Sequence, residues 1–359
     1  AMDRRQFLTT GLYGTIAATT HAASNDLKTI KVGLIGNQGH TGYVFSGMPK
    51  VQGARLAAYA KTTPDQDVSW LRKSKLFTEQ THVFDHYEQM LEETELDVAV
   101  VCLPYYRNAK ASIAAAEKGI HIISEKPVAT TEKDLNALER AVQENNVRLT
   151  AMFGMRYIPA YLCIHNAIAN GKIGEPILAS AQKSYKFGRS RPDFFKKRET
   201  YGGSFLWVAI HAVDYIHFTT GLDYTMVMGL HGNKEHPQYP GCEDYGAMVL
   251  QFDNGGVADI HIDYLRPPKA PTHGDDRLRI VGADGVIELK DFGKRVELIE
   301  GNNEPRDLDL PEPGNLFIDF AAELRGEGKH LIGPEDAIRM TRVCIKARQA
   351  ADRKEVVRI

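Results

Sequence analysis

The segment TIKVGLIGNQGHTG, residues 29–42, decides the fold of this chain. It opens with a short apolar, β-branched run that ends in glycine, a pattern typical of a buried strand. Glycines after such a strand let the backbone turn sharply and approach a pyrophosphate, and the N–H groups that open the next helix favour an anion. The residues expected to form this phosphate-binding loop are Gly36, Asn37, Gln38, Gly39, His40 and Thr41.

The glycine spacing in this loop is GxxGxxG, whereas the usual dinucleotide-binding fingerprint is GxGxxG. A glycine motif alone is weak evidence, but this one follows a predicted strand at the start of a β-α-β pattern. We therefore interpret it as a dinucleotide-binding loop. A glycine-rich turn that binds nothing is the alternative.

The first part of the chain alternates between strand and helix patterns. Strands are predicted over residues 29–36, 54–60, 96–104, 120–127 and 147–154, and helices over residues 111–119 and 132–146. The second of these helices is amphipathic, with Leu135, Leu138 and Val142 on one face. Such alternation favours a parallel, doubly wound sheet, the Rossmann arrangement.

Beyond residue 154 the strand patterns follow one another with few helices between them. Predicted strands cover residues 176–188, 226–234, 245–255, 257–265, 278–290 and 295–300, and predicted helices cover residues 160–174, 204–221 and 333–353. The turns FDNGG and GADG are hairpin signals, so this part is expected to form a mostly antiparallel sheet. The fold class is therefore α/β. We expect a leader or arm over residues 1–27, a Rossmann domain over residues 28–152, and an α/β domain with a large open sheet over residues 153–359.

The composition is that of an ordinary globular protein, with 359 residues, 43% hydrophobic and 25% charged, and a formal net charge of -2. No block of Lys and Arg stands out, so we expect no nucleic-acid partner. No apolar run approaches the ~20 residues of a membrane span. The four cysteines lie far apart and form no CxxC pair, which argues against a zinc knuckle or a disulfide framework.

The N-terminal stretch DRRQFLTTGLYGTIAATTHAAS, residues 3–24, has the pattern of a twin-arginine export leader. Arg4 and Arg5 precede a weakly apolar run of small residues. A leader of this kind predicts a periplasmic or exported protein. An arm that stays attached and packs on a partner subunit predicts a cytoplasmic one instead.

The second predicted strand ends at Ala60 and Lys61. A carboxylate usually stands there and binds the ribose hydroxyls of the adenosine, but the first one here is Asp65. A lysine is able to face a 2′-phosphate, so the sequence admits NADP as readily as NAD. A solvated lysine at a strand end is the alternative.

Lys126 lies in SEKPVA at the end of a predicted buried strand. In open α/β sheets, ligands bind beyond the carboxyl ends of the strands. The ammonium would then face the cofactor crevice and hydrogen-bond the carbon–oxygen bond that gains or loses a hydride. Partial burial would lower its pKa and let it share in proton transfer. A surface lysine is the alternative interpretation.

His211 lies in the apolar helix predicted over residues 204–221. A buried histidine there is either a general acid/base near a sugar-sized cavity or a core residue with its hydrogen bonds satisfied. Asp214 shares its helix face, and we expect it to fix the orientation of the imidazole. His217 lies about 120° around the helix from His211, so one metal ion cannot easily bind both, and we expect no metal site.

Six stretches occur in the order found in the Gfo/Idh/MocA oxidoreductases, and they are the glycine loop, VVCLPYYRNAKASIAAAEKGIHIISEKPVA, NGKIGEP, GGSFLWVAIHAVD, LRIVGADGVIEL and the closing helix. From about Lys28 to the C-terminus, the chain resembles this family, which includes glucose–fructose oxidoreductase and inositol dehydrogenase. The resemblance implies a nicotinamide cofactor and a sugar, cyclitol or related polyol as substrate. It also implies a C-terminal domain that binds the substrate and pairs subunits through its sheet into dimers or tetramers.

The resemblance also implies roles for single residues. Lys126 matches the lysine of the EKP motif, which assists at the reacting hydroxyl, and His211 matches the proton-transferring histidine. The residues that fall at positions bordering the cofactor are Leu103, Pro104, Asn108, Glu125, Lys126 and Arg156.

Two departures from the family pattern stand out. The family helix commonly reads D-x-G-x-H, but Trp207 stands in place of that Asp, and Asn108 stands where a His is usual. An indole suits stacking on the apolar face of a sugar ring, or it fills the core. The stretch over residues 183–203 is either a substrate-contacting loop or a solvated one, and its candidate contacts are Tyr185, Arg189, Arg191 and Asp193.

Three functions are compatible with these residues. The first is an NAD(P)-dependent oxidoreductase acting on a sugar, glycoside or cyclitol hydroxyl, with tightly bound cofactor. The second is a redox-neutral, NAD-dependent glycoside hydrolase or lyase on the same fold. The third is a sugar-binding regulator without catalysis, because fold alone does not settle function.

Overall fold

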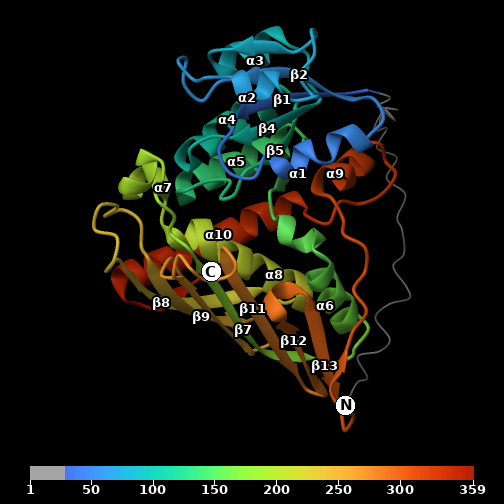
Figure 1. The fold of residues 1–359 in the computed structure, drawn as a ribbon, viewed down its shortest axis with the longest axis vertical. Helices are drawn as coiled ribbons and strands as arrows, with labels where there is room; N and C mark the ends of the chain where they lie inside the picture. The colour runs from blue at the N-terminus through green and yellow to red at the C-terminus, as the bar shows by residue number, and fades with distance from the viewer. Residues whose placement is uncertain (1–28) are drawn as a thin grey trace.

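The computed structural model describes residues 29–359. The leader or arm expected over residues 1–27 therefore lies outside the described residues. The described chain forms two sheets, which Figure 1 shows one above the other with helices between them.

The first sheet confirms the predicted Rossmann arrangement. Six parallel strands lie in the order β3-β2-β1-β4-β5-β6. Their bounds are β1 Ile30–Gly36, β2 Ala54–Ala60, β3 His82–Phe84, β4 Val98–Cys102, β5 His121–Ser124 and β6 Leu149–Ala151. Strand β3 was not predicted, because its three residues are too few to show a period. This strand order places the switch in winding direction between β1 and β4, where dinucleotides bind in such sheets.

Five helices belong to this part of the chain, and two of them are single turns. Their bounds are α1 Gly42–Phe45, α2 Ser69–Arg72, α3 Tyr87–Glu93, α4 Asn108–Glu117 and α5 Glu132–Glu144. Helix α5 buries Leu135, Leu138 and Val142, as its period predicts, and Thr131 caps it by accepting the Asp134 N–H. Short 3₁₀ turns cover η2 Met48–Lys50, η3 Tyr105–Arg107 and η4 Gly154–Tyr157.

The second sheet confirms the predicted mostly antiparallel sheet. Nine strands lie in the order β14-β13-β12-β11-β7-β10-β9-β8-β15, and only the β7–β10 pair is parallel. Their bounds are β7 Pro176–Tyr185, β8 Tyr224–Gly232, β9 Tyr245–Phe252, β10 Val257–Asp263, β11 Gly274–Gly282, β12 Gly285–Lys290, β13 Arg295–Glu300, β14 Arg306–Asp307 and β15 Val357–Arg358. The two expected hairpin turns join β9 to β10 and β11 to β12.

Helices α6 Pro159–Ala169, α8 Ile210–Thr220 and α10 Pro334–Arg353 lie between the two sheets (Figure 1). Helix α8 is buried along nearly its whole length. It follows directly on a stretch of π-helix, η6 Phe205–Ala209, so the helix predicted over residues 204–221 is wider in its first part. Short helical segments η5 Asp193–Lys196, α7 Arg198–Tyr201 and η7 Asp291–Gly293 complete this part of the chain.

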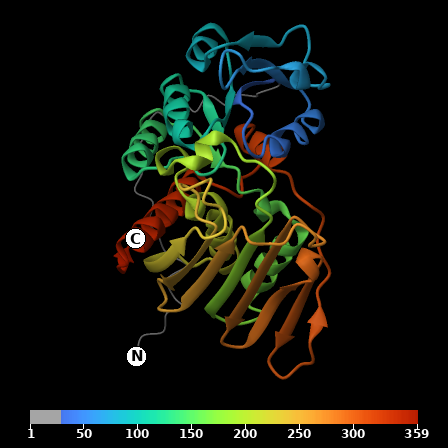
Figure 2. The same ribbon diagram turned by 60° about the vertical axis from the view of Figure 1, so that its left-hand side comes forward.

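The C-terminal helices return to the Rossmann sheet. Helix α9 Leu316–Leu324 lies beside α1 in both views (Figures 1 and 2), and the side chain of Asn315, its N-cap, donates to Ser46 Oγ at 3.1 Å. Arg342 of α10 pairs with Glu139 of α5 at 2.7 Å. These contacts fix the Rossmann sheet above the second sheet. Within residues 29–359, no helix is both long and apolar enough to span a membrane.

Candidate active site

The glycine loop folds over the carboxyl ends of β1 and β4. Gly36 and Gly39 both take positive φ values, 71° and 77°, which a glycine adopts at no steric cost. The Gln38 N–H donates to the Cys102 carbonyl at 2.8 Å, which ties the loop to β4. The helix that follows, α1, is only one turn long, so the loop backbone rather than a long helix would meet a phosphate.

Two features beside Gly36 fit a dinucleotide. A Cβ on Gly36 would collide with the Cys102 carbonyl oxygen, so no side chain can stand there. The hydroxyl of Thr62 lies next to that position, and it is buried without a hydrogen-bond partner. An unpartnered buried hydroxyl costs free energy unless a ligand satisfies it. Sequence reasoning missed Thr62, although it directly follows Lys61 at the end of β2.

Lys61 itself is engaged by the protein. Its ammonium pairs with Asp85 at 2.8 Å and donates to the Pro64 carbonyl at 2.9 Å. The side chain is four-fifths buried rather than a freely solvated lysine. Asp85, the residue that follows β3, thus brings a carboxylate to the end of β2, where it pairs with Lys61.

Glu125 clamps the loop from the end of β5. Its fully buried carboxylate accepts the His40 backbone N–H at 2.5 Å and the Lys126 N–H at 2.8 Å, and it lies 3.0 Å from His40 Nδ1. A Cβ on Gly39 would overlap this carboxylate. Burial raises the pKa of Glu125, but His40 and Lys126 outweigh burial and hold that pKa below its usual range. The carboxylate is therefore ionised and fixes the loop.

Asn108 ties the turn after β4 to the turn after β5. Its side chain accepts the Leu103 N–H at 3.1 Å and donates to the carbonyls of Glu125 and Pro127 at 3.3 and 3.2 Å. Asn108 is fully buried, and backbone groups take up both its amide oxygen and its amide nitrogen. Leu103 is buried and Pro104 half-buried in the same turn.

Lys126 lies against Trp207 from the π-helix. Its Nζ donates to the Trp207 carbonyl oxygen at 2.6 Å and lies 3.2 Å from the centre of the indole ring. Burial outweighs the attraction of Glu125 and, together with the charge of Lys183, lowers the pKa of Lys126 to about 7. The alternative of a surface lysine is therefore wrong, because Lys126 is almost completely buried.

Trp207 does not present a free face to a sugar ring. The ring of Tyr105 stacks on it at 4.2 Å with an interplanar angle of 17°, and the Lys126 ammonium covers it as well. The expectation that Trp207 stacks on substrate is therefore not met in this arrangement. The indole instead positions the lysine through a cation–π contact.

His211 is buried next to this cluster. The edge of its ring meets the His40 ring at 5.7 Å, and His40 also contacts Trp207 at 5.6 Å. His211 Nδ1 is buried without a hydrogen-bond partner. Burial, with the charges of Lys126 and Lys183, holds the pKa of His211 well below its usual range, so the imidazole is neutral.

The expectation that Asp214 orients His211 is wrong. Both Asp214 oxygens face Arg156, whose Nη2 donates to Oδ1 at 2.6 Å. Arg156 also pairs with Asp336 of α10 at 2.9 Å. Arg156 was expected to border the cofactor, but the structure places it in this buried ion cluster, where it joins η4, α8 and α10.

The remaining candidates lie on the second sheet and its loops. Tyr185 ends β7 beside the buried Lys183, whose ammonium is 5.3 Å from its ring. Arg191 lies over the ring of Tyr264 at 4.1 Å, and exposed Asp193 pairs with Lys196 at 2.6 Å. Tyr185 thus contacts a residue, Lys183, whose charge reaches Lys126 and His211. Arg189 is exposed and lines a separate cavity of about 470 Å³. Within residues 29–359, no group of three or more metal-ligating side chains is arranged around one point.

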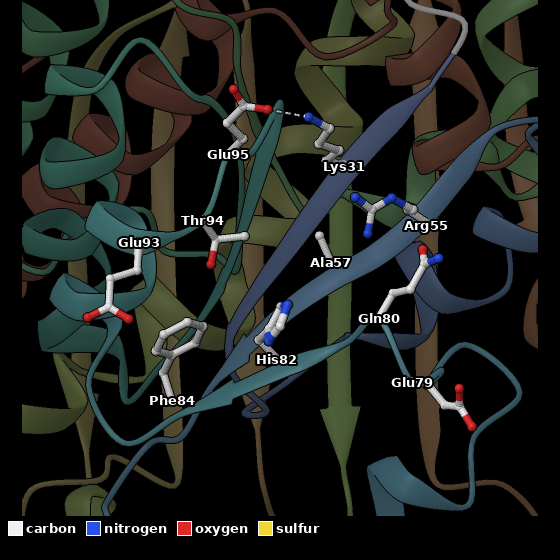
Figure 3. Close-up of a pocket in the computed structure, with 10 residues that line it drawn as sticks. All are labelled: Lys31, Arg55, Ala57, Glu79, Gln80, His82, Phe84, Glu93, Thr94 and Glu95. Atoms are coloured by element: carbon white, nitrogen blue, oxygen red, sulfur yellow. Dashed lines mark hydrogen bonds and ion pairs between the residues drawn. The ribbon is translucent and has the colours of Figure 1, made fainter.

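A separate cavity of about 720 Å³ opens on the Rossmann sheet (Figure 3). Lys31 and Arg55, near the starts of β1 and β2, line it together with His82 of β3. It therefore lies at the amino ends of these strands, whereas the glycine loop lies at their carboxyl ends. None of the residues expected to bind cofactor or substrate lines it.

Comparisons with known proteins agree with this geometry. Residues 30–153 match an oxidoreductase family with an NAD-binding Rossmann fold, and residues 161–288 match the GFO/IDH/MocA C-terminal domain. The structure of an oxidoreductase from Thermotoga maritima is 38% identical, with a TM-score of 0.85, and the match covers 92% of this chain and 100% of that one.

The chain belongs to the Gfo/Idh/MocA oxidoreductase family.

Two dehydrogenases of Bacillus subtilis (strain 168) are similar to it. The NAD(+)-dependent scyllo-inositol 2-dehydrogenase is 29% identical over 209 residues, which are 56% of this chain and 57% of that protein. The NADP(+)-dependent scyllo-inositol 2-dehydrogenase is 22% identical over 320 residues, 84% of this chain and 80% of that protein. The N-terminal part of this Gfo/Idh/MocA chain is thus an NAD(P)-binding Rossmann domain, and similar proteins use either form of the cofactor.

Replacing Lys126 with Met should stabilise the folded Gfo/Idh/MocA chain in a pH-dependent way. The ammonium has a pKa of about 7 in the folded chain, against 10.5 for an unperturbed lysine, so folding disfavours its charged form. Below pH 7 this cost is fully present, and it fades as the pH rises toward 10.5. The melting temperature of Lys126→Met should therefore exceed the wild-type value by about 2 °C or more at pH 6, with a smaller difference at pH 9.

Lys110→Met is the matched control, because Lys110 is exposed on α4. This variant should melt at the wild-type temperature at both pH values. A Lys126 variant that melts at or below the wild-type temperature at pH 6 would contradict the lowered pKa.

Proposed function

We propose that this chain is an NAD(P)-dependent oxidoreductase that acts on a hydroxyl of a sugar, glycoside or cyclitol and holds its cofactor tightly. One observation carries the proposal: the buried Lys126 and His211 come together beside the glycine loop, one from the turn after β5 and one from α8. The ring of His40 bridges from the loop to the helix that carries His211. Burial brings the pKa of Lys126 to about 7, where a general acid or base works best at neutral pH.

The chemistry divides between the cofactor and the chain. Bound NAD(P)⁺ supplies the acceptor for the hydride that leaves the carbinol carbon. Lys126 would hydrogen-bond the hydroxyl oxygen and stabilise the negative charge that develops there. The hydroxyl proton would pass to the neutral imidazole of His211 or to the amine of Lys126. The cluster of aromatic rings around both groups excludes water from that transfer.

A redox-neutral glycoside hydrolase or lyase is the second candidate. The twin-arginine pattern at Arg4 and Arg5 favours it, because an exported enzyme would have no supply of fresh cofactor. Such an enzyme would oxidise a sugar hydroxyl and use the acidified neighbouring C–H to eliminate the aglycone. A hydrolase would then add water to the double bond, and the hydride would return to the same sugar. A sugar-binding regulator is disfavoured, because it would need neither a lysine with a pKa of about 7 nor a buried imidazole without a hydrogen-bond partner.

Purified protein should show nicotinamide absorbance or fluorescence without added cofactor and retain it through gel filtration. A screen of cyclitols, free sugars and glycosides should then follow cofactor reduction and glycosidic cleavage in parallel. Net reduction supports the oxidoreductase, and cleavage without net reduction supports the redox-neutral enzyme. Lys126→Met should lose both activities by at least about 100-fold yet keep the cofactor. Steady turnover only with added NAD(P) would overturn the tightly bound cofactor.

We also propose that two or four copies associate through the second sheet. The face of this sheet turned away from the helices exposes large apolar side chains: Leu178 of β7, Met228 and Leu230 of β8, Val249 of β9 and Val257 of β10. In-register pairing places Met228 beside Val249 and Val257 beside Leu178. Contiguous exposed apolar surface of this kind marks an interface.

Leu230→Glu should convert the assembly to monomers, because it would bury a charge in the apolar interface. Light scattering after gel filtration measures the mass. Leu310→Glu, at an exposed apolar position outside this sheet face, is the control and should leave the mass unchanged. A wild-type protein that is monomeric at micromolar concentration would rule the interface out.

We further propose that the full chain is exported by the twin-arginine route. The support is the sequence of residues 3–24 and the compatibility of that route with a folded, cofactor-loaded chain. Changing both Arg4 and Arg5 to Lys should keep the protein in the cytoplasmic fraction of a host that has this pathway. Arg140→Lys, at an exposed site on α5, should not alter fractionation. An unchanged cytoplasmic location for the wild type would favour the attached arm.

A further inference from the structure

Two adjacent strands of the second sheet bring a lysine and an aspartate together on the face that packs under α8. Lys183 of β7 and Asp276 of β11 are cross-strand neighbours, and Figure 1 shows the two strands side by side. Lys183 Nζ lies 2.8 Å from Asp276 Oδ2. The lysine side chain is completely buried, and the aspartate side chain is a quarter exposed.

Packing does not explain this pair. Ala179 and Ala181 precede Lys183 on the same face of β7, and both are buried apolar residues. An apolar side chain in place of Lys183 would continue that row. Buried ion pairs add little net stability, because the cost of desolvating both charges offsets their attraction. A buried pair at the end of an apolar row therefore needs another explanation.

The pair has hydrogen-bonding capacity that the protein leaves unused. Asp276 Oδ1 is buried and has no partner among the described residues. The Lys183 ammonium carries three N–H donors, of which one points to Asp276 and one to the thioether sulfur of Met155 at 3.2 Å. The Tyr185 hydroxyl engages the ammonium as well. One charged acceptor, Asp276 Oδ1, is thus open beside the ammonium. The hydroxyl group of a ligand, which has a hydrogen to donate, matches this acceptor.

The pair lies close to the proposed reaction centre. The charge of Lys183 reaches both His211 and Lys126, and lowers the pKa of each. The charges of Lys183 and Asp276 also act on the pKa of Tyr43 in α1. The ring of Tyr43 stacks on that of His40 at 5.4 Å. Elements of both domains therefore surround the same region.

We propose that Lys183 and Asp276 form a hydroxyl-binding subsite for a neutral polyol, at ring hydroxyls away from the carbon that is oxidised. This proposal rests on the proposed function, whose substrate class it narrows. Asp276 Oδ1 accepts a hydroxyl hydrogen, and the ammonium of Lys183 holds that carboxylate in place. Because the pair is neutral overall, it selects uncharged sugars or cyclitols over sugar acids, whose carboxylate would meet Asp276.

The test compares the wild-type, cofactor-loaded enzyme with the double variant Lys183→Met/Asp276→Asn. Removing both charges together leaves neither one buried and unpaired. The probes are scyllo-inositol, D-glucose and D-glucuronate, with binding measured by calorimetry and turnover by cofactor reduction. For the neutral probe that binds better, we expect Kd and KM to rise about tenfold or more, as for the loss of a charged hydrogen bond. The amount of retained cofactor should not change.

A series of singly deoxygenated analogues of the same probe gives a second measurement, which uses the wild-type enzyme and does not depend on whether the variant folds. One analogue should bind about tenfold more weakly than its parent, and that analogue should bind the double variant and the wild type equally. The control variant is Lys172→Met/Glu300→Gln, which removes a half-exposed ion pair elsewhere in the domain. It should leave every constant unchanged.

The outcomes separate the two proposals. Unchanged Kd and KM in the double variant, a flat deoxy series, or tighter binding of D-glucuronate than of either neutral probe would each overturn the subsite. Polyol binding that depends on Lys183 and Asp276 but is never followed by hydride transfer would keep the subsite and overturn the oxidoreductase. A wild-type enzyme that binds no polyol would overturn both.

Discussion

The site depends on one buried carboxylate. The Glu125 carboxylate accepts the His40 N–H and so holds the glycine loop. It also accepts the N–H of the next residue, Lys126, and it orients the His40 ring. That ring then touches both Trp207 and His211 on the second domain. A carboxylate with no exposed surface must have its charge satisfied, so every element that bonds to it is held in place. Cofactor loop, lysine and histidine therefore have one common support.

A second buried cluster joins three helical elements of the second domain. Arg156 pairs with Asp214 on α8 and with Asp336 at the start of α10, and it donates to the Leu331 carbonyl at 2.6 Å. Removing one partner from such a cluster leaves an unpaired buried charge, which typically costs roughly 3–5 kcal/mol. Asp214 follows His211 by three residues on α8, so the cluster also fixes the helix that carries the imidazole.

The sequence predicted those parts of the structure that depend on local pattern. The alternation of strands and helices gave the six-stranded parallel sheet, and the position of Lys126 at a strand end gave its burial beside the loop. Helical spacing placed Asp214 near His211 but said nothing of Arg156, which is 58 residues away in the chain. The burial of Lys183 could not be predicted either, because a lysine in an alternating strand normally faces solvent. Its partner lies on a strand 93 residues further on.

Trp207 shows how one substitution changes the electrostatics of the whole site. A carboxylate at this position, as the family commonly has, would hold the adjacent lysine charged. The indole offers only a ring face and a backbone carbonyl to Lys126, so desolvation outweighs attraction and the pKa falls to about 7. Lys183 of the same region stays charged, because Asp276 raises its pKa despite burial. Burial, with the charges of Lys126 and Lys183, keeps His211 neutral. The site therefore holds a neutral imidazole and a lysine that titrates near pH 7 beside a charge-balanced pair, a combination suited to removing a proton from a neutral hydroxyl while another hydroxyl of the same molecule is held.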